Sequence, residues 1–81
     1  PIAQRYWFPS PGKVTSIKGF DDYKDNKDVL LLEIRLEVGD LVTSINSHPK
    51  RAGVVITKGK TIRSAIELAE KIVRNIKIET N

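Results

Sequence analysis

The amino-acid sequence predicts a small α+β domain, in which about five short strands form a mostly antiparallel sheet or half-barrel and one C-terminal amphipathic helix packs across it. Three observations predict this fold class. Short apolar runs separated by glycine and proline fill most of the chain. Residues 29–38 alternate with a period of two, and apolar residues after Thr61 recur at helical spacing. Strands followed by a helix, without alternation between the two, are typical of α+β domains.

The first quarter of the chain predicts two strands. Residues 2–8 are rich in aromatic and β-branched side chains, and the strand that they predict stops at the turn 9–12, where two prolines and a glycine occur. Residues 13–18 alternate between polar and apolar side chains and predict a second short strand. Residues 19–28 are polar, and we expect a loop or one helical turn there.

The middle of the chain predicts three more strands. The strongest pattern covers residues 29–38, where one face of a strand would carry the apolar side chains of Leu32, Ile34, Leu36 and Val38. Residues 41–45 predict a shorter strand, and residues 46–51 predict a loop around a proline. Residues 52–57 predict a fifth strand, in which Gly53 marks a bulge or a close approach of another backbone.

The C-terminal part predicts the helix. Thr61 is a suitable N-cap, because its hydroxyl can accept a hydrogen bond from a free amide of the first turn. The residues expected on the buried face of the helix recur at helical spacing and are Ile62, Ala65, Ile66, Ala69, Ile72, Val73 and Ile76. After the helix, Ile78 predicts a further short strand.

Composition limits the classes of function. The chain has 81 residues, of which 40% are apolar and 30% charged, as expected for one folded domain spanning residues 1–81. It contains no cysteine, which excludes disulfides and thiolate metal sites and is consistent with a cytoplasmic protein. The net charge of +4 is spread along the chain rather than clustered as in many nucleic-acid-binding proteins, and no apolar stretch is long enough to span a membrane. The chain begins directly in an apolar run and has no methionine, so we expect a fragment of a longer protein.

Three motifs that carry chemistry in other proteins are incomplete here. The Gly-Lys-Thr triplet at 59–61 lies between a predicted strand and helix, but a phosphate-binding loop requires a further glycine where this chain has Val54. We therefore interpret the triplet as a turn and a helix cap. The single histidine, His48, lies in a polar loop and is expected to be solvated. The acidic residues of 21–28 lack the spacing of a calcium-binding loop.

Two arginines and three aromatic residues are the candidate functional side chains. Arg5 and Arg51 each lie near the end or edge of a predicted strand, where a guanidinium can bind a carboxylate or phosphate, or simply lie exposed with its stem on the sheet. Tyr6, Trp7 and Phe8 alternate between the two faces of their strand. One face should belong to the core, and the other should pack against the rest of a larger protein or stack on nucleic-acid bases.

Several segments resemble known ATP-grasp enzymes. Residues 8–15 read Phe-Pro-Ser-Pro-Gly-Lys-Val-Thr and closely resemble the Phe-Leu-Pro-Ser-Pro-Gly-Lys-Ile-Thr segment of the biotin carboxylase C-terminal domain. Residues 51–57, followed by Gly59 and a helix with Ala65 and Ala69, resemble the tail of the ATP-grasp superfamily. The compact spacing before the Pro-Ser-Pro-Gly motif is most similar to the C-terminal domain of L-amino-acid ligases, and glycinamide ribonucleotide synthetases are a more distant match.

This resemblance implies a function. The chain would be the C-terminal accessory domain of an ATP-dependent carboxylate–amine ligase, packing on the upstream grasp domains and lining the substrate site. Those upstream domains would hold ATP and magnesium and join the small-molecule carboxylate and amine through an acyl phosphate, so the domain alone would be inactive. Arg5 matches an arginine that stabilises an anion in the related carboxylases, and Trp7 and Arg51 would line the substrate site.

The sequence also departs from biotin carboxylase. The acidic insertion after the matching arginine is missing, and residues 47–53 replace an Asp-Ser-x-x-Gly-Lys segment, which argues against biotin as the substrate. Two alternatives remain open. One is a free-standing basic β-module that binds single-stranded nucleic acid through Arg5, Trp7 and nearby lysines, and the other is a domain that joins the subunits of an assembly.

Overall fold

The computed structural model of the chain describes residues 1–43 and 52–81. Within them the chain forms six strands, one short 3-10 helix and one long α-helix. In chain order these elements are β1 (Ile2–Tyr6), β2 (Gly12–Lys18), η1 (Phe20–Asp22), β3 (Val29–Ile34), β4 (Leu41–Val42), β5 (Gly53–Lys58), α2 (Ile62–Asn75) and β6 (Lys77–Thr80).

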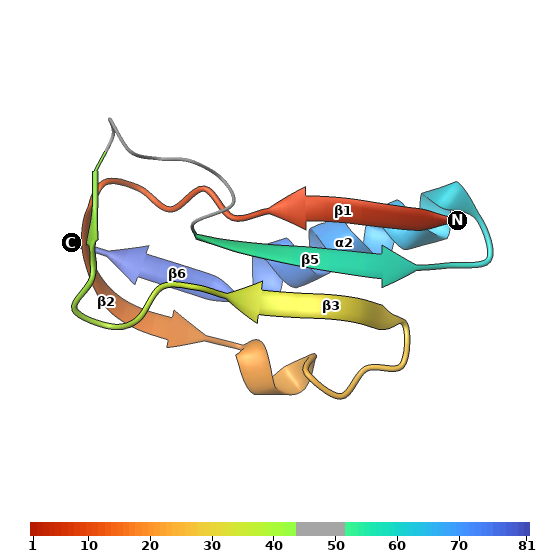
Figure 1. The fold of residues 1–81 in the computed structure, drawn as a ribbon, viewed down its shortest axis with the longest axis horizontal. Coiled ribbons are helices and arrows are strands. Elements are labelled where there is room, and N and C mark those ends of the chain that lie inside the picture. Colours follow the sequence, from red (N-terminus) through yellow and green to blue (C-terminus); the bar gives the residue numbers. More distant parts are fainter. Residues whose placement is uncertain (44–51) are drawn as a thin grey trace.

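The described strands form two three-stranded sheets rather than one (Figure 1). The first sheet has the order β1-β5-β3 and the second has the order β4-β2-β6, and every pairing in both is antiparallel. The predicted α+β class is therefore confirmed, whereas a single half-barrel of about five strands is not. β1 ends at Tyr6, before the predicted end at residue 8, and a segment with two prolines separates it from β2 in the second sheet.

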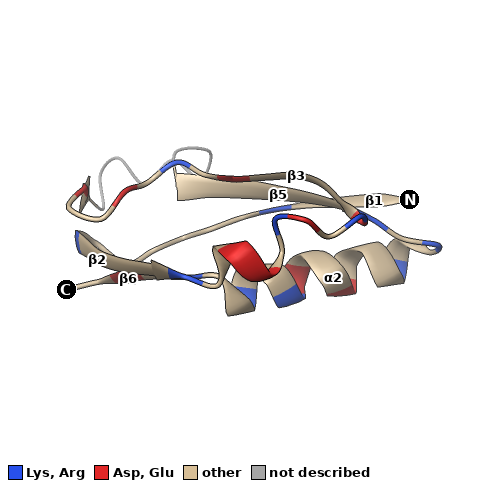
Figure 2. Ribbon diagram, turned by 90° about the horizontal axis from the view of Figure 1, so that it is seen from below, with Lys and Arg blue, Asp and Glu red and all other residues tan. Residues whose placement is uncertain are grey.

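Helix α2 packs on one face of the first sheet (Figure 2). Ala3 and Trp7 in and after β1, together with Val55 from β5, meet the buried stripe of the helix. That stripe consists of Ala65, Ala69 and Ile72, and the core continues into Ile76. Thr57 of β5 is also fully buried, and its hydroxyl donates a 2.7 Å hydrogen bond to the carbonyl oxygen of Ala65.

The helix begins as the sequence predicts. Thr61 is the N-cap, and its hydroxyl oxygen accepts a 3.0 Å hydrogen bond from the amide of Ser64. The Ser64 hydroxyl oxygen accepts in turn from the amide of Thr61 at 3.1 Å, which completes a capping box. Ile62, however, was wrongly placed on the buried face. It is 57% exposed, because the contact between helix and sheet begins one turn later at Ala65.

The strand predicted over residues 29–38 is shorter in the structure. Leu32, Ile34 and Leu36 pack against the core as expected, but β3 ends at Ile34. Val38 is 64% exposed, because it precedes a turn at Gly39 rather than continuing the sheet. The glycine has a φ of 101° there, which other residues rarely adopt. Of the strand predicted at 41–45, β4 covers only Leu41–Val42, and residues 44 and 45 lie outside the described residues.

The Pro-Ser-Pro-Gly turn brings the chain to its C-terminal strand. Gly12 has a φ of 140°, and a Cβ atom at this position would collide with the backbone carbonyl of Asn81. The amide of Asn81 donates a 3.1 Å hydrogen bond to the carbonyl oxygen of Lys13. Strand β6, predicted only from Ile78, thereby closes against β2 and completes the second sheet.

Substitution Trp7→Phe should destabilise the domain. The indole N–H of Trp7 donates a 2.9 Å buried hydrogen bond to the carbonyl oxygen of Ile76, and phenylalanine leaves that carbonyl without this donor. We expect a loss of about 1–3 kcal/mol in the free energy of unfolding, measured by urea denaturation. The control is Phe8→Leu, which changes a neighbouring side chain that is 73% exposed and should shift stability by less than about 0.5 kcal/mol. Equal effects of the two substitutions would contradict the role of Trp7.

Substitution Gly53→Ala should also be destabilising, because β3 approaches this glycine closely. A Cβ atom there would lie 2.7 Å from the carbonyl oxygen of Glu33 and 3.0 Å from Cδ1 of Ile34. We expect a loss of about 1–3 kcal/mol by the same measurement. Gly39→Ala is an informative comparison, since open space surrounds that glycine and only its positive φ opposes a side chain. An unchanged stability for Gly53→Ala would show that β3 and β5 can separate at no cost.

Candidate functional site

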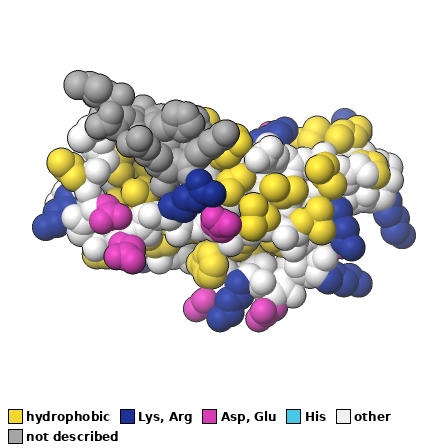
Figure 3. Space-filling view, viewed as in Figure 1, with side chains coloured by type: hydrophobic (Ala, Val, Ile, Leu, Met, Phe, Trp, Pro, Cys, Tyr) yellow, Lys and Arg dark blue, Asp and Glu magenta, His cyan; other side chains and the backbone are white. Residues whose placement is uncertain are grey.

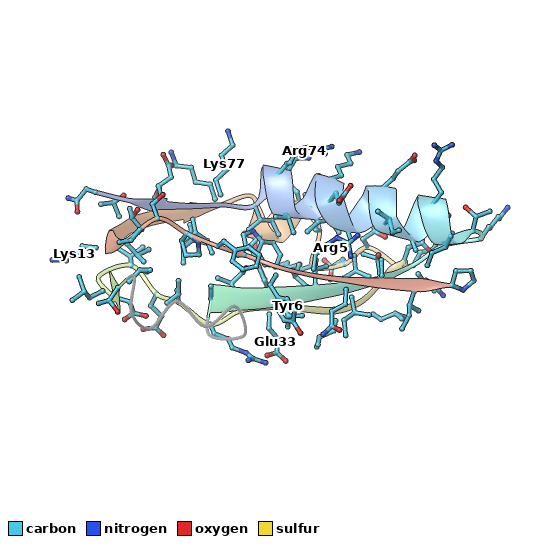
Figure 4. The ribbon with its side chains drawn as sticks, turned by 90° about the horizontal axis from the view of Figure 1, so that it is seen from above. Arg5, Tyr6, Lys13, Glu33, Arg74 and Lys77 are labelled. Carbon is cyan, nitrogen blue, oxygen red and sulfur yellow. The ribbon has the colours of Figure 1, made fainter. Side chains whose placement is uncertain are left out.

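Arg5 lies on the edge strand β1 and points to the α2 side of the sheet (Figure 4). Its side chain is 38% exposed. One terminal nitrogen, Nη1, donates a 2.8 Å hydrogen bond to the carbonyl oxygen of Gln4, which fixes the orientation of the guanidinium. The Nε atom lies 3.7 Å from Oε2 of Glu70 on α2, which is a loose ion pair at the surface.

The guanidinium of Arg5 can therefore accept a further anion. A guanidinium carries five N–H donors in a planar fork, which matches the geometry of a carboxylate or a phosphate. In the described part of the chain, Arg5 makes one hydrogen bond and one long ion pair. Glu70 is itself 53% exposed, so it can move aside for an incoming anion without leaving a buried charge unpaired.

Trp7 belongs to the core rather than to the free surface. It is only 4% exposed, and its indole N–H is already engaged by Ile76. The next residue, Phe8, is 73% exposed. The alternation of these aromatic residues thus follows the sequence prediction, with Trp7 inward and Phe8 outward.

Trp7 nevertheless contributes to a shallow open groove. The groove has a volume of about 460 Å³ and is lined by residues 7–9, Val73 and residues 76–79. Its walls come from the two ends of the chain, so no local sequence pattern predicts it. Arg5 is not among the lining residues, so the structure does not bring Arg5 and Trp7 into one pocket. Arg51 and His48 lie outside the described residues.

Glu79, one of the residues that line the groove, contacts a hydroxyl group and a lysine of β2. The Ser16 hydroxyl donates a 2.8 Å hydrogen bond to this carboxylate, and the ammonium of Lys18 lies 3.4 Å from it. The Ser16 hydrogen bond first, and then Lys18, lower the pKa of Glu79 below its ordinary value. Glu79 therefore stays negatively charged, and the groove has an acidic group at one rim beside the basic Lys77.

The motifs interpreted as structural have structural roles. The amide of Gly59 donates a 3.1 Å hydrogen bond to the carbonyl oxygen of Pro1, and Thr61 caps α2, so the Gly-Lys-Thr triplet is a turn and a cap as predicted. Over residues 1–43 and 52–81, no group of three or more His, Cys, Asp or Glu side chains is arranged to hold a metal ion. None of the helices in that part of the chain is both long and apolar enough to cross a membrane.

Comparison with known proteins identifies the family. A family model described as L-amino acid ligase C-terminal domain 2 matches residues 5–81. Neither the curated proteins nor the solved structures give a significant match to this chain. The family match begins at Arg5 and includes the Pro-Ser-Pro-Gly turn, α2 and β6. Because the match covers nearly the whole chain, this protein belongs to the L-amino acid ligase C-terminal domain 2 family.

Proposed function

We propose that this chain completes the substrate site of an ATP-dependent ligase that joins a carboxylate to an amine. The family match supports a ligase, and the resemblance of residues 8–15 to the biotin carboxylase C-terminal domain supports the ATP-grasp class. In this proposal ATP and magnesium are bound upstream, by the grasp domains of the same polypeptide. The chain described here supplies a wall of the site and is inactive alone.

The observation that carries the proposal is the geometry of Arg5. Its guanidinium is oriented by the carbonyl oxygen of Gln4, belongs to a side chain that is 38% exposed, and has the loosely bound Glu70 carboxylate as its only ion-pair partner within the described residues. A preorganised cation of this kind stabilises negative charge most strongly where a neighbouring domain excludes water. We assign to Arg5 the binding of the substrate carboxylate or of the acyl phosphate formed from it.

Trp7 and Arg51 have supporting roles in this proposal. Trp7 would shape the substrate site from within, because it fixes the position of the segment that carries Phe8 and Pro9 along the groove. Arg51 remains a predicted substrate-lining residue. The chemistry of the parent enzyme, including which amino acids it joins, would be decided by the upstream domains together with these side chains.

The alternative of a free-standing nucleic-acid-binding module receives no support. The family match concerns a ligase, and Trp7 is buried with its indole N–H engaged by a backbone carbonyl. Base stacking requires an accessible aromatic face. Of the residues assigned to that module, only Arg5 and surface lysines remain accessible, and such residues occur on many soluble domains.

Substitution Arg5→Ala in the intact ligase tests the assignment. We expect kcat/KM for ATP-dependent ligation to fall about 10²–10³-fold, as when one donor to a developing anion is removed. Arg5→Lys keeps the charge but loses the fork geometry and should recover only part of the activity. Steady-state kinetics with varied carboxylate substrate would separate an effect on binding from an effect on turnover.

The matched control for this experiment is Arg63→Ala. Arg63 is 88% exposed on α2, and its one ion pair in the described part of the chain is a long surface contact with Glu67, so its loss should leave kcat/KM unchanged. Thermal unfolding of both variants would show whether the domain remains folded. Normal turnover in Arg5→Ala would rule out the proposed role of this arginine.

A further inference from the structure

One face of the first sheet, which we call the open sheet face, has no helix upon it within residues 1–43 and 52–81. The register of the strands assigns its residues. Gln4 pairs with Ile56, Tyr6 with Val54, and Leu31 with Ile56, so these side chains share one face together with Ile2 and Glu33. The opposite face carries Val55 and Thr57, which contact α2.

The open sheet face carries apolar side chains from all three strands, beside a smaller number of polar ones. Ile2 is 58% exposed and Leu31 is 36% exposed, whereas Val54 in the central strand is 4% exposed. Figure 3 shows hydrophobic side chains gathered over β1, β5 and β3 on this side of the molecule. From Val54 to Ile56, β5 thus carries apolar side chains on both faces, a pattern typical of strands that are covered on both sides. Apolar sheet faces require a second layer, and among the described residues only one of the two faces has it.

Four polar side chains on or beside the open sheet face contact one another in two pairs, whereas Lys58, which lies opposite Ile2, is exposed at the end of β5. The side-chain amide of Gln4 donates a 3.0 Å hydrogen bond to the hydroxyl oxygen of Tyr6. The guanidinium of Arg35, just beyond β3, lies 3.1 Å from the Glu33 carboxylate. Burial beneath another domain would therefore leave these four side chains with partners, which lowers the penalty for covering them. Lys58 is at the end of β5, where its long side chain can extend to solvent.

We infer that the open sheet face is the surface through which this domain docks on the preceding part of the ligase polypeptide. The inference rests on the proposed function, because it requires that the domain works as part of a larger ligase. The occupant follows from two observations: the family match is to a C-terminal domain of a ligase, and Pro1 lies at the start of β1, directly before Ile2 of the open sheet face. The polypeptide that precedes this domain in a ligase joins at the margin of the apolar surface.

Tethering favours this occupant over a second copy of the chain. A covalently linked neighbour is present at an effective concentration in the millimolar range when the link is short. A separate copy reaches that concentration only at high total protein. If the preceding part of the polypeptide did not cover the open sheet face, only association between separate ligase molecules could cover it.

The docking surface leaves Arg5 accessible. Figure 4 shows Arg5 on the α2 side of β1 and Tyr6 and Glu33 on the opposite side. Because β1 is the edge strand, a domain that covers the open sheet face meets β1 from one side, and Arg5 stays available at the edge from the other. Docking and anion binding are therefore separate properties of the domain that can be tested separately.

Cysteine labelling tests the inference, since the 81 residues contain no cysteine. The variants are Ile2→Cys on the open sheet face and Ile62→Cys on α2, which replace side chains that are 58% and 57% exposed. In the 81-residue chain the two thiols should react with a maleimide at rates within about twofold. In the intact ligase, on a background without other reactive cysteines, we expect the Ile2→Cys thiol to react at least about tenfold more slowly than the Ile62→Cys thiol.

Each other outcome overturns a specific part of the inference. Equal rates in the intact ligase would show that the open sheet face is not a docking surface. Protection of the Ile2→Cys thiol that already occurs in the 81-residue chain and increases with its concentration would show that a second copy is the occupant. The result is independent of Arg5→Ala: normal turnover of that variant with a protected Ile2→Cys thiol would reject the anion role alone, and the reverse pair of results would reject docking alone.

Discussion

The indole N–H of Trp7 donates its hydrogen bond to the carbonyl oxygen of Ile76 at the junction of the main parts of the fold. Trp7 directly follows β1 of the first sheet, and Ile76 lies between the end of α2 and the start of β6 in the second sheet. The contact therefore ties the two sheets and the helix together, although the two residues are far apart in sequence. Both are almost completely buried, so the hydrogen bond is shielded from competition by water.

Around this junction the two faces of the first sheet have different environments. Ala65, Ala69 and Ile72 close the face beneath α2, while the other face keeps exposed leucine and isoleucine side chains. Arg5 lies where these environments meet, on an edge strand, with its guanidinium oriented by a backbone carbonyl. Within the described residues, a helix covers only one face of this sheet. The uncovered face is available for packing against a larger neighbouring domain, as the proposed docking requires.

Local elements were predictable from the sequence, but their assembly was not. The N-cap at Thr61, the helix and the strand at Ile78 depend on neighbouring residues, and the structure confirms them. Ile62 is exposed because the helix first meets the sheet beyond it, and Val38 is exposed because β3 ends before it. Both boundaries depend on contacts with residues distant in sequence. The division into two sheets and the groove beside Trp7 likewise depend on contacts between the two ends of the chain. Arg5 became a candidate through the resemblance to the related carboxylases, and its loose pairing with Glu70 became visible only in three dimensions.

The close approach of Gly12 to the carbonyl group of Asn81 changes how the Pro-Ser-Pro-Gly motif should be interpreted. The motif contributed most to the resemblance with the ATP-grasp enzymes, yet its glycine is constrained by the fit of one backbone against another. In this chain the motif is therefore a packing feature, at the place where β2 meets the C-terminal end of β6. A resemblance in this motif indicates shared packing and does not by itself indicate a shared substrate.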